Sequence, residues 1–113
     1  MATYDKLTYN IPPYQEGNVV DLVFDMDDNF PLNEVSDITF QIRTQRGEIV
    51  MSKLKSLNQI NLTGRTITIL FAPSETKDKS GSHVYEIDFK NLIGEPFATI
   101  GGTFIINKEI NTL

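Results

Sequence analysis

The chain has 113 residues, 40% of them hydrophobic and 22% charged, which is typical of one folded domain with a single core and excludes a disordered protein. Lys and Arg total 10 and Asp and Glu total 15, so the formal net charge is −5. The sign of this charge and the scattered positions of the basic residues argue against nucleic acid and anionic membranes as partners.

No cysteine is present, so the chain can form neither a disulfide framework nor a thiolate metal site. Residues 1–6 lack the basic and apolar segments of a signal peptide. No window approaches the roughly 20 apolar residues of a membrane-spanning helix. We therefore expect synthesis in the cytosol, with export only as part of a larger assembly.

Residues 1–18 are predicted to form an extended N-terminal arm or edge strand. Apolar and polar residues alternate from Leu7 to Ile11, and two consecutive prolines follow, which a sheet tolerates at an edge or where a strand changes sheet. The arm carries tyrosines, whose amphipathic rings suit contacts with a neighbouring protein. We predict these as partner-binding residues: Tyr4, Tyr9 and Tyr14. A sugar-binding platform is the alternative role.

Seven segments with strand-like patterns follow the arm, separated by turns rich in Gly, Pro, Asn and Asp. They are residues 19–25, 37–43, 48–52, 59–62, 65–71, 83–90 and 98–106. The alternation is clearest in 37–43, where Ile38, Phe40 and Ile42 are predicted to point into the core. Residues 73–81 are predicted to cross between two sheets.

These segments together predict an all-β fold, an immunoglobulin-like antiparallel β-sandwich of about seven to eight strands. The expected boundaries are 1–18 for the arm and 19–113 for the sandwich domain. A small β-barrel is the competing architecture. Two layers are expected because the long hairpin of 83–106 has a dry face on each strand, and an isolated hairpin is at best marginally stable in water.

The polar loop from Asp25 to Pro31 is the one segment that partly matches a metal-binding pattern. Asp25, Asp27 and Asn29 occupy the first, third and fifth places of a calcium loop. Phe30 stands where that loop requires glycine, and Ser36 where it requires glutamate. We therefore predict a solvated turn and no metal site. Calcium bound here, within a carbohydrate- or surface-binding module, is the alternative hypothesis.

His83 is the only histidine, and its strand pattern places it on the dry face. No serine and carboxylate are positioned around it by any sequence signal, so we predict no catalytic residue and no cofactor, and a hydrolase is the least favoured reading. The pair Gly101 and Gly102 is no phosphate loop, because no helix follows it. Close strand packing or a bulge explains these glycines.

Four segments resemble the small virion β-sandwich domains of tailed bacteriophages, in particular the N-terminal domain of baseplate upper proteins. They are residues 67–76 (ITILFAPSET), 81–88 (GSHVYEID), Gly94, and 102–110 (GTFIINKEI). The family reads Gly-x-Tyr-x-Tyr-Asp-Ile in the second segment, so His83 replaces its first tyrosine and Glu86 its aspartate. The likeness covers residues 19–110 and consists of fold motifs without an active site.

The resemblance implies a non-enzymatic structural protein of a phage virion, as a capsid decoration or auxiliary protein or as a baseplate or tail accessory protein. Its implied partners are other virion proteins, with self-association in the assembled particle and with no nucleic acid or membrane. Its implied location is the virion, after synthesis in the cytoplasm of the bacterial host.

Overall fold

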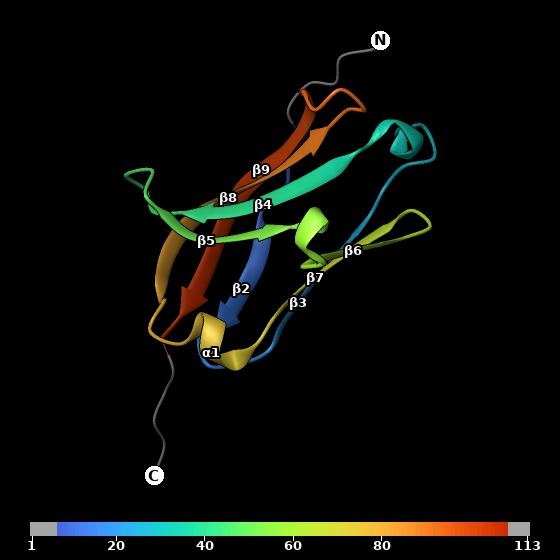
Figure 1. Cartoon of the computed structure of the whole chain (residues 1–113). Coiled ribbons are helices and arrows are strands. Elements are labelled where there is room, and N and C mark those ends of the chain that lie inside the picture. Colours follow the sequence, from blue (N-terminus) through green and yellow to red (C-terminus); the bar gives the residue numbers. More distant parts are fainter. Residues whose placement is uncertain (1–6, 109–113) are drawn as a thin grey trace.

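The computed structural model describes residues 7–108 and is built almost entirely of strands (Figure 1). These residues form β1 (Leu7–Thr8), β2 (Ile11–Gln15), β3 (Val20–Asp25), β4 (Asp37–Arg43), β5 (Ile49–Leu54), β6 (Ile60–Thr63), β7 (Thr66–Phe71), β8 (Gly81–Lys90) and β9 (Pro96–Asn107). The other elements are α1 (Pro73–Thr76) and the 3-10 turns η1 (Leu32–Glu34) and η2 (Lys55–Leu57). The predicted all-β class is confirmed.

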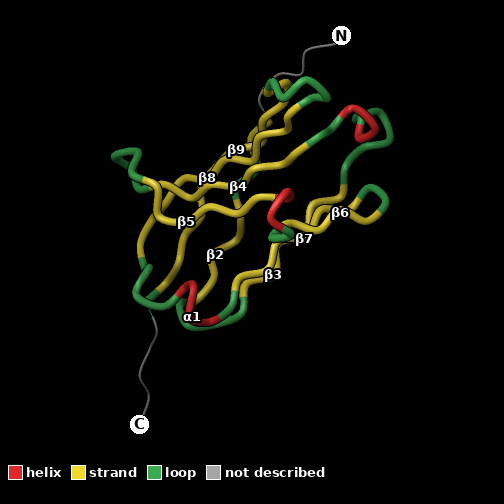
Figure 2. The backbone as a smooth tube through the Cα atoms, in the orientation of Figure 1, coloured by secondary structure: helices red, strands yellow, loops and turns green. Residues whose placement is uncertain are grey.

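The strands form two sheets (Figure 2). The larger sheet has the order β1-β9-β8-β4-β5, and β2 also pairs with β9. The smaller sheet has the order β3-β7-β6. Both arm strands run parallel to β9, whereas the remaining pairs are antiparallel. This arrangement is compatible with a β-sandwich.

The period-two pattern determines which face of each strand is buried. In β4 the side chains of Ile38, Phe40 and Ile42 are fully buried, and the residues between them are half-exposed. Phe40 lies opposite Ile87 of β8, and Ile42 lies opposite Tyr85. Burial of each aliphatic or aromatic side chain contributes about 1.5 to 3 kcal/mol, so register between these strands is strongly specified.

Aromatic rings join the two layers in the middle of the core. Phe40 of the larger sheet and Phe71 of the smaller sheet have ring centroids 5.6 Å apart. Phe71 also meets Phe104 of β9 edge-on, at 6.4 Å. These contacts place hydrophobic side chains of both sheets in one continuous core.

The crossover from β7 to β8 passes through α1 and connects the smaller sheet to the larger one. Glu75 in α1 accepts a hydrogen bond from the backbone of Ala72 and pairs with Lys53 of β5. Burial raises the pKa of Glu75, but the hydrogen bonds from Lys53 and Ala72 outweigh that effect and hold the pKa below its ordinary value. The crossover is thereby tied to the edge of the larger sheet.

The number of strands in residues 7–108 exceeds the predicted seven to eight, because the arm is divided in two. The regular pairing with β9 is interrupted at Tyr9 and Asn10 and resumes at Ile11. The reason is a close approach between the arm and β9, which is described below.

Candidate interaction surface

The arm lies along this chain's own β9 from residue 7 to residue 15. At the bend between β1 and β2, the backbone N–H of Tyr9 donates to the carbonyl of Gly101 at 2.8 Å. The side-chain oxygen of Asn10 accepts a hydrogen bond from the backbone N–H of Thr103 at 3.2 Å. Both bonds hold the arm against the middle of β9.

Gly102 permits this contact because it has no side chain. A Cβ at this position would overlap the carbonyl oxygen of Tyr9 and lie 2.8 Å from the carbonyl carbon. Real Cβ atoms do not approach backbone so closely, so any other residue must push the arm away. The interpretation of this glycine as a site of close packing is confirmed, and its neighbour is the arm.

Tyr85 of β8 also binds the arm. Its side chain is 3% exposed, and its hydroxyl donates to the backbone carbonyl of Tyr9 at 2.5 Å. Burial, with a smaller contribution from the Tyr9 phenol, raises the pKa of Tyr85 to about 12. The bend of the arm therefore contacts β8 as well as β9.

The three predicted partner-binding tyrosines differ in their surroundings. Tyr4 lies outside the described residues. Tyr9 is 51% exposed, and its ring meets that of Phe24 edge-on at 5.9 Å. Tyr14 is half-buried, with its ring 6.1 Å from that of Phe104. Of the two described tyrosines, Tyr9 offers the larger free surface, and the partner-binding role stays a prediction.

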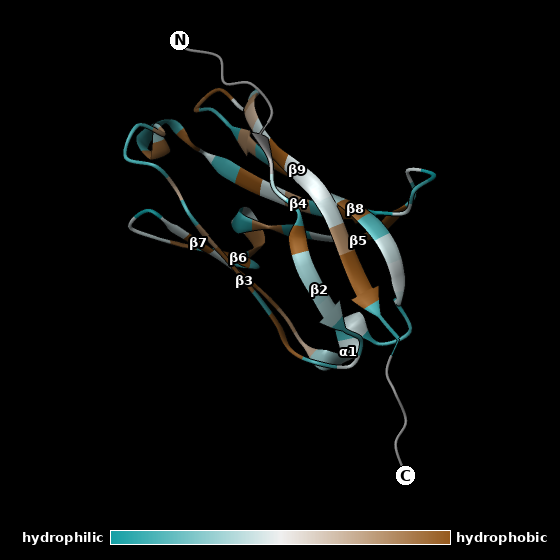
Figure 3. Cartoon of the chain, turned by 180° about the vertical axis from the view of Figure 1, so that it is seen from behind, coloured by the Kyte–Doolittle hydropathy of each residue, from teal (hydrophilic) through white to brown (hydrophobic). Residues whose placement is uncertain are grey.

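A groove runs between the arm and β3. Figure 3 shows the ribbons of β2 and β3, which border it. The groove consists of two depressions of about 210 and 390 Å³, which share Tyr9, Val23 and Phe24 as lining residues. We call this feature the β3 groove. Aliphatic side chains of Ile11 and Ile100 complete its apolar lining.

The turn between β8 and β9 presents a second apolar feature, the hairpin tip, which comprises residues 91–95. Leu92 is 70% exposed and Ile93 is 77% exposed. The turn is held from within by Asn91, whose side-chain oxygen accepts hydrogen bonds from the N–H groups of Ile93 and Glu95 at 3.1 and 2.9 Å. Sequence reasoning treated this segment only as a turn, although two consecutive aliphatic residues beside Gly94 are an unusual turn composition.

Arg65 organises the loop between β3 and η1, and its Nε atom also lies 3.7 Å from a carboxylate oxygen of Asp28. The guanidinium group donates to the backbone carbonyls of Asp27 and Phe30, the latter at 2.6 Å, and to that of Met26 at 3.3 Å. Asp25 accepts a hydrogen bond from Thr66. The carbonyl oxygens that converge here therefore already bind a cationic side chain, which opposes calcium at the same place. Within residues 7–108, no three His, Cys, Asp or Glu side chains are grouped as a metal site.

His83 is 7% exposed and faces the core side of β8, as its strand pattern predicted. Its Nε2 atom lies 2.8 Å from the backbone carbonyl oxygen of Lys79. A carbonyl oxygen only accepts, so Nε2 carries the hydrogen. Nδ1 is buried, and no described group hydrogen-bonds to it. The imidazole thus anchors the start of β8 to the crossover.

The chain was compared with known protein families and with curated protein sequences, and neither comparison gave a match. The resemblance to phage virion domains therefore stays a prediction. Within the described part of the chain, no helix is long or apolar enough to cross a bilayer.

Replacement of Gly102 by alanine is expected to displace the arm, because the new Cβ overlaps the Tyr9 carbonyl. We expect the free energy of unfolding to fall by about 1 to 3 kcal/mol. The Tyr9 amide should exchange its hydrogen faster, as measured by NMR. Thr103→Ala, one residue along β9 and without added bulk, should keep the slow exchange. Slow exchange in Gly102→Ala would contradict the close approach.

The raised pKa of Tyr85 predicts a loss of stability at high pH. The phenol titrates near 10.0 when unfolded and near 12 when folded, so the folded state alone retains the proton between these values. The stabilisation is complete below pH 10 and is lost towards pH 12, with a slope of up to about 1.4 kcal/mol per pH unit. The free energy of unfolding, measured by urea unfolding at several pH values in this range, should fall less steeply with pH in Tyr85→Phe than in the wild type. Equal slopes would exclude the Tyr85 contribution.

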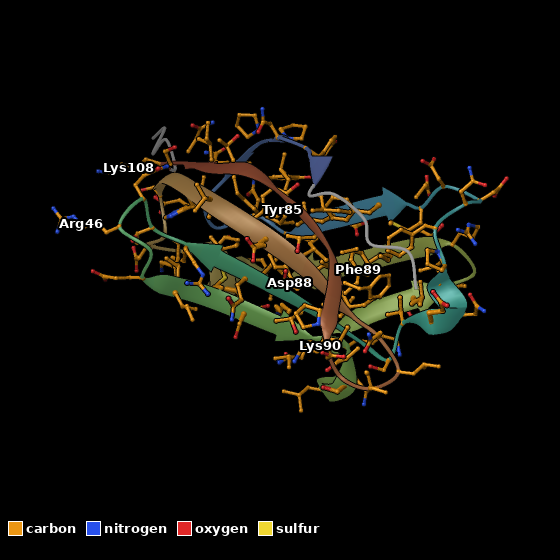
Figure 4. The ribbon with its side chains drawn as sticks, turned by 90° about the horizontal axis from the view of Figure 1, so that it is seen from above. Arg46, Tyr85, Asp88, Phe89, Lys90 and Lys108 are labelled. Atoms are coloured by element: carbon orange, nitrogen blue, oxygen red, sulfur yellow. The ribbon has the colours of Figure 1, made fainter. Side chains whose placement is uncertain are left out.

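Arg65→Lys is expected to loosen the loop of residues 26–30 while keeping the charge. An ammonium group cannot reproduce the divergent N–H donors of guanidinium, so unfolding should become easier by about 1.5 to 3 kcal/mol. The measurement is the urea midpoint. Arg46→Lys is the matched control, because Arg46 is exposed in the turn between β4 and β5 (Figure 4). Equal midpoints for the two variants would count against the anchoring role of Arg65.

Proposed function

We propose that this chain is a non-enzymatic structural protein of a bacteriophage particle, either a capsid decoration protein or a baseplate or tail accessory protein. In this proposal it binds neighbouring virion subunits through complementary surfaces and is present in symmetric copies. The observation that carries the proposal is the hairpin tip, where Leu92 and Ile93 are exposed on a turn held by a buried asparagine.

The hairpin tip suits a protein contact for two physical reasons. Covering each aliphatic side chain on binding would contribute about 1.5 to 3 kcal/mol. The hydrogen bonds of Asn91 fix the turn in advance, so little conformational entropy is lost when a partner binds. Other exposed aliphatic residues, such as Ile49 and Leu57, lie on separate elements and do not form such a pair.

An immunoglobulin-like fold is part of the proposal and is supported by the strand order. The sheet β3-β7-β6 resembles strands B, E and D of such domains, and β5-β4-β8-β9 resembles strands C′, C, F and G. The hydrogen bond from His83 to the carbonyl of Lys79 also resembles the tyrosine corner, in which a side chain at the start of strand F bonds to backbone a few residues upstream. An imidazole takes the place of the phenol here.

The arm has a different role in this proposal from the one expected from the sequence. Residues 7–15 cover the free edge of this chain's own β9, so they stabilise the domain itself. The exposed ring of Tyr9 remains available to a neighbouring subunit. The calcium-assisted carbohydrate alternative loses support, because Arg65 binds the carbonyls of the loop proposed for the ion.

The test is incorporation into particles of a phage whose genome encodes this chain. The gene is deleted and complemented with the wild type, with Leu92→Ser/Ile93→Ser, or with the control Ile49→Ser/Leu57→Ser. Gradient-purified particles are then immunoblotted. Wild-type and control chains should be incorporated. The amount of the tip variant in purified particles should fall at least tenfold, since a loss of about 3 kcal/mol of binding free energy lowers affinity about a hundredfold.

Two results would overturn parts of the proposal. If the wild-type chain stays in the lysate and is absent from purified particles, the virion role is wrong. If the tip variant enters particles at the wild-type level, the hairpin tip is not the contact. Urea unfolding of the purified variants shows whether each remains folded.

A further inference from the structure

Within residues 7–108, both edges of the smaller sheet are unpaired, and the edge at β3 borders the β3 groove. Within residues 7–108, β3 pairs with β7 on one side and with no strand on the other. The arm strands, which pass nearby, pair with β9 instead. The open edge of β3 is therefore a wall of the β3 groove, and the arm forms the opposite wall.

The hydrogen-bonding direction of β3 follows from the residue after it. The backbone N–H of Met26 donates to the carbonyl of Arg65, the residue just before β7, at 2.8 Å. In an antiparallel pair, alternate residues direct their backbone groups to the same neighbour. The backbone N–H and C=O groups of Leu22 and Phe24 therefore point to β7, whereas those of Asp21, Val23 and Asp25 point into the groove. Consistent with this direction, the carbonyl oxygen of Asp21 lies 3.5 Å from the hydroxyl of Tyr14 in the arm.

The groove offers an added strand an apolar surface as well as backbone groups. The half-buried side chains of Phe24 and Met26 line it from the β3 side, and Ile100 lines it from the larger sheet. Val23 is 54% exposed on the outer face of β3. A strand placed here would cover these apolar groups on both of its faces.

The rim of the groove is acidic. Asp21, Asp25 and Asp27 line it, and neither depression is lined by a lysine or an arginine among the described residues. Asp21 and Asp25 share the outer face of β3 with Val23 between them. Opposite charges on adjacent strands stabilise pairing, and like charges destabilise it. The chain's own charge of −5 makes a second copy a poor match for this rim.

We propose that the β3 groove binds an extended segment of another protein by β-augmentation. The register of β3 defines that segment as basic at two positions four residues apart, with three aliphatic residues between them. The basic residues pair with Asp21 and Asp25, and the middle aliphatic residue lies opposite Val23. The other two aliphatic residues fill the apolar depressions. The inference rests on the proposed function of the chain as a partner-binding module, and it names the partner's chemistry.

The test uses a capped synthetic peptide, Thr-Lys-Val-Val-Ile-Lys-Thr, titrated into the full chain and followed by NMR. Binding should shift the amide signals of Asp21, Val23, Asp25 and Tyr9. One control peptide replaces both lysines by glutamate, and another replaces the central valine by proline, which removes a backbone donor. Each control should bind at least tenfold more weakly.

Variants of the protein locate the site. Asp21→Lys should weaken peptide binding at least tenfold, and Glu48→Lys, with the same charge change in the distant turn between β4 and β5, should not. Val23→Pro should also weaken binding, because it removes an N–H that points away from β7. Asp21→Lys keeps the test valid if the proline variant does not fold.

Each outcome supports or overturns the inference. Shifts at the named amides that Asp21→Lys abolishes support it. No binding up to millimolar peptide, or equal binding to Asp21→Lys and Glu48→Lys, overturns it. Shifts at the same amides on concentrating the protein alone would assign the groove to a second copy and overturn the basic partner. Incorporation into particles without peptide binding would leave the virion role intact and remove only this inference.

Discussion

The close approach of the arm to β9 at Gly102 is the constraint on which the rest of the structure depends. The Tyr9 carbonyl lies where a side chain at this position would be, and the buried hydroxyl of Tyr85 donates to the same carbonyl. The arm therefore covers the edge of the larger sheet, where an open strand would invite unwanted pairing. Because the arm pairs there, it is not available to β3, whose outer edge has no partner among residues 7–108.

The edge of β9 and the edge of β3 are therefore protected in different ways. The outer edge of β9 is covered by the arm, whose two prolines cannot donate to a further strand. The edge of β3 instead carries Asp21 and Asp25, charges that discourage pairing with copies of the same acidic chain. Such an edge is protected against self-aggregation and open to a basic strand. In the proposed assembly, the same feature would favour a basic strand over a second copy of this chain.

Two cationic side chains of this acidic protein bind groups within the chain itself. Arg65 binds the carbonyls of the loop after β3, and Lys53 pairs with Glu75 while its ammonium lies 4.9 Å from the centre of the Phe71 ring. Each of these side chains stabilises a connection between two strands. The hairpin tip is fixed differently, by the amide of Asn91. The Asn91 hydrogen bonds explain how a short turn presents Leu92 and Ile93 in a fixed conformation.

Local periodicity was enough to predict most of the strands and their buried faces, because a period of two is a local property. The alternation of 37–43 identified Ile38, Phe40 and Ile42, and all are fully buried. The pair Gly101 and Gly102 was predicted to mark close strand packing or a bulge, but the neighbour of Gly102 lies more than ninety residues away in the chain. Long-range contacts established that the arm pairs with β9, that Arg65 binds the loop of the calcium-like pattern, and that β3 has an unpaired edge in the described part of the chain. Those outcomes depend on contacts between distant residues, which local periodicity does not encode.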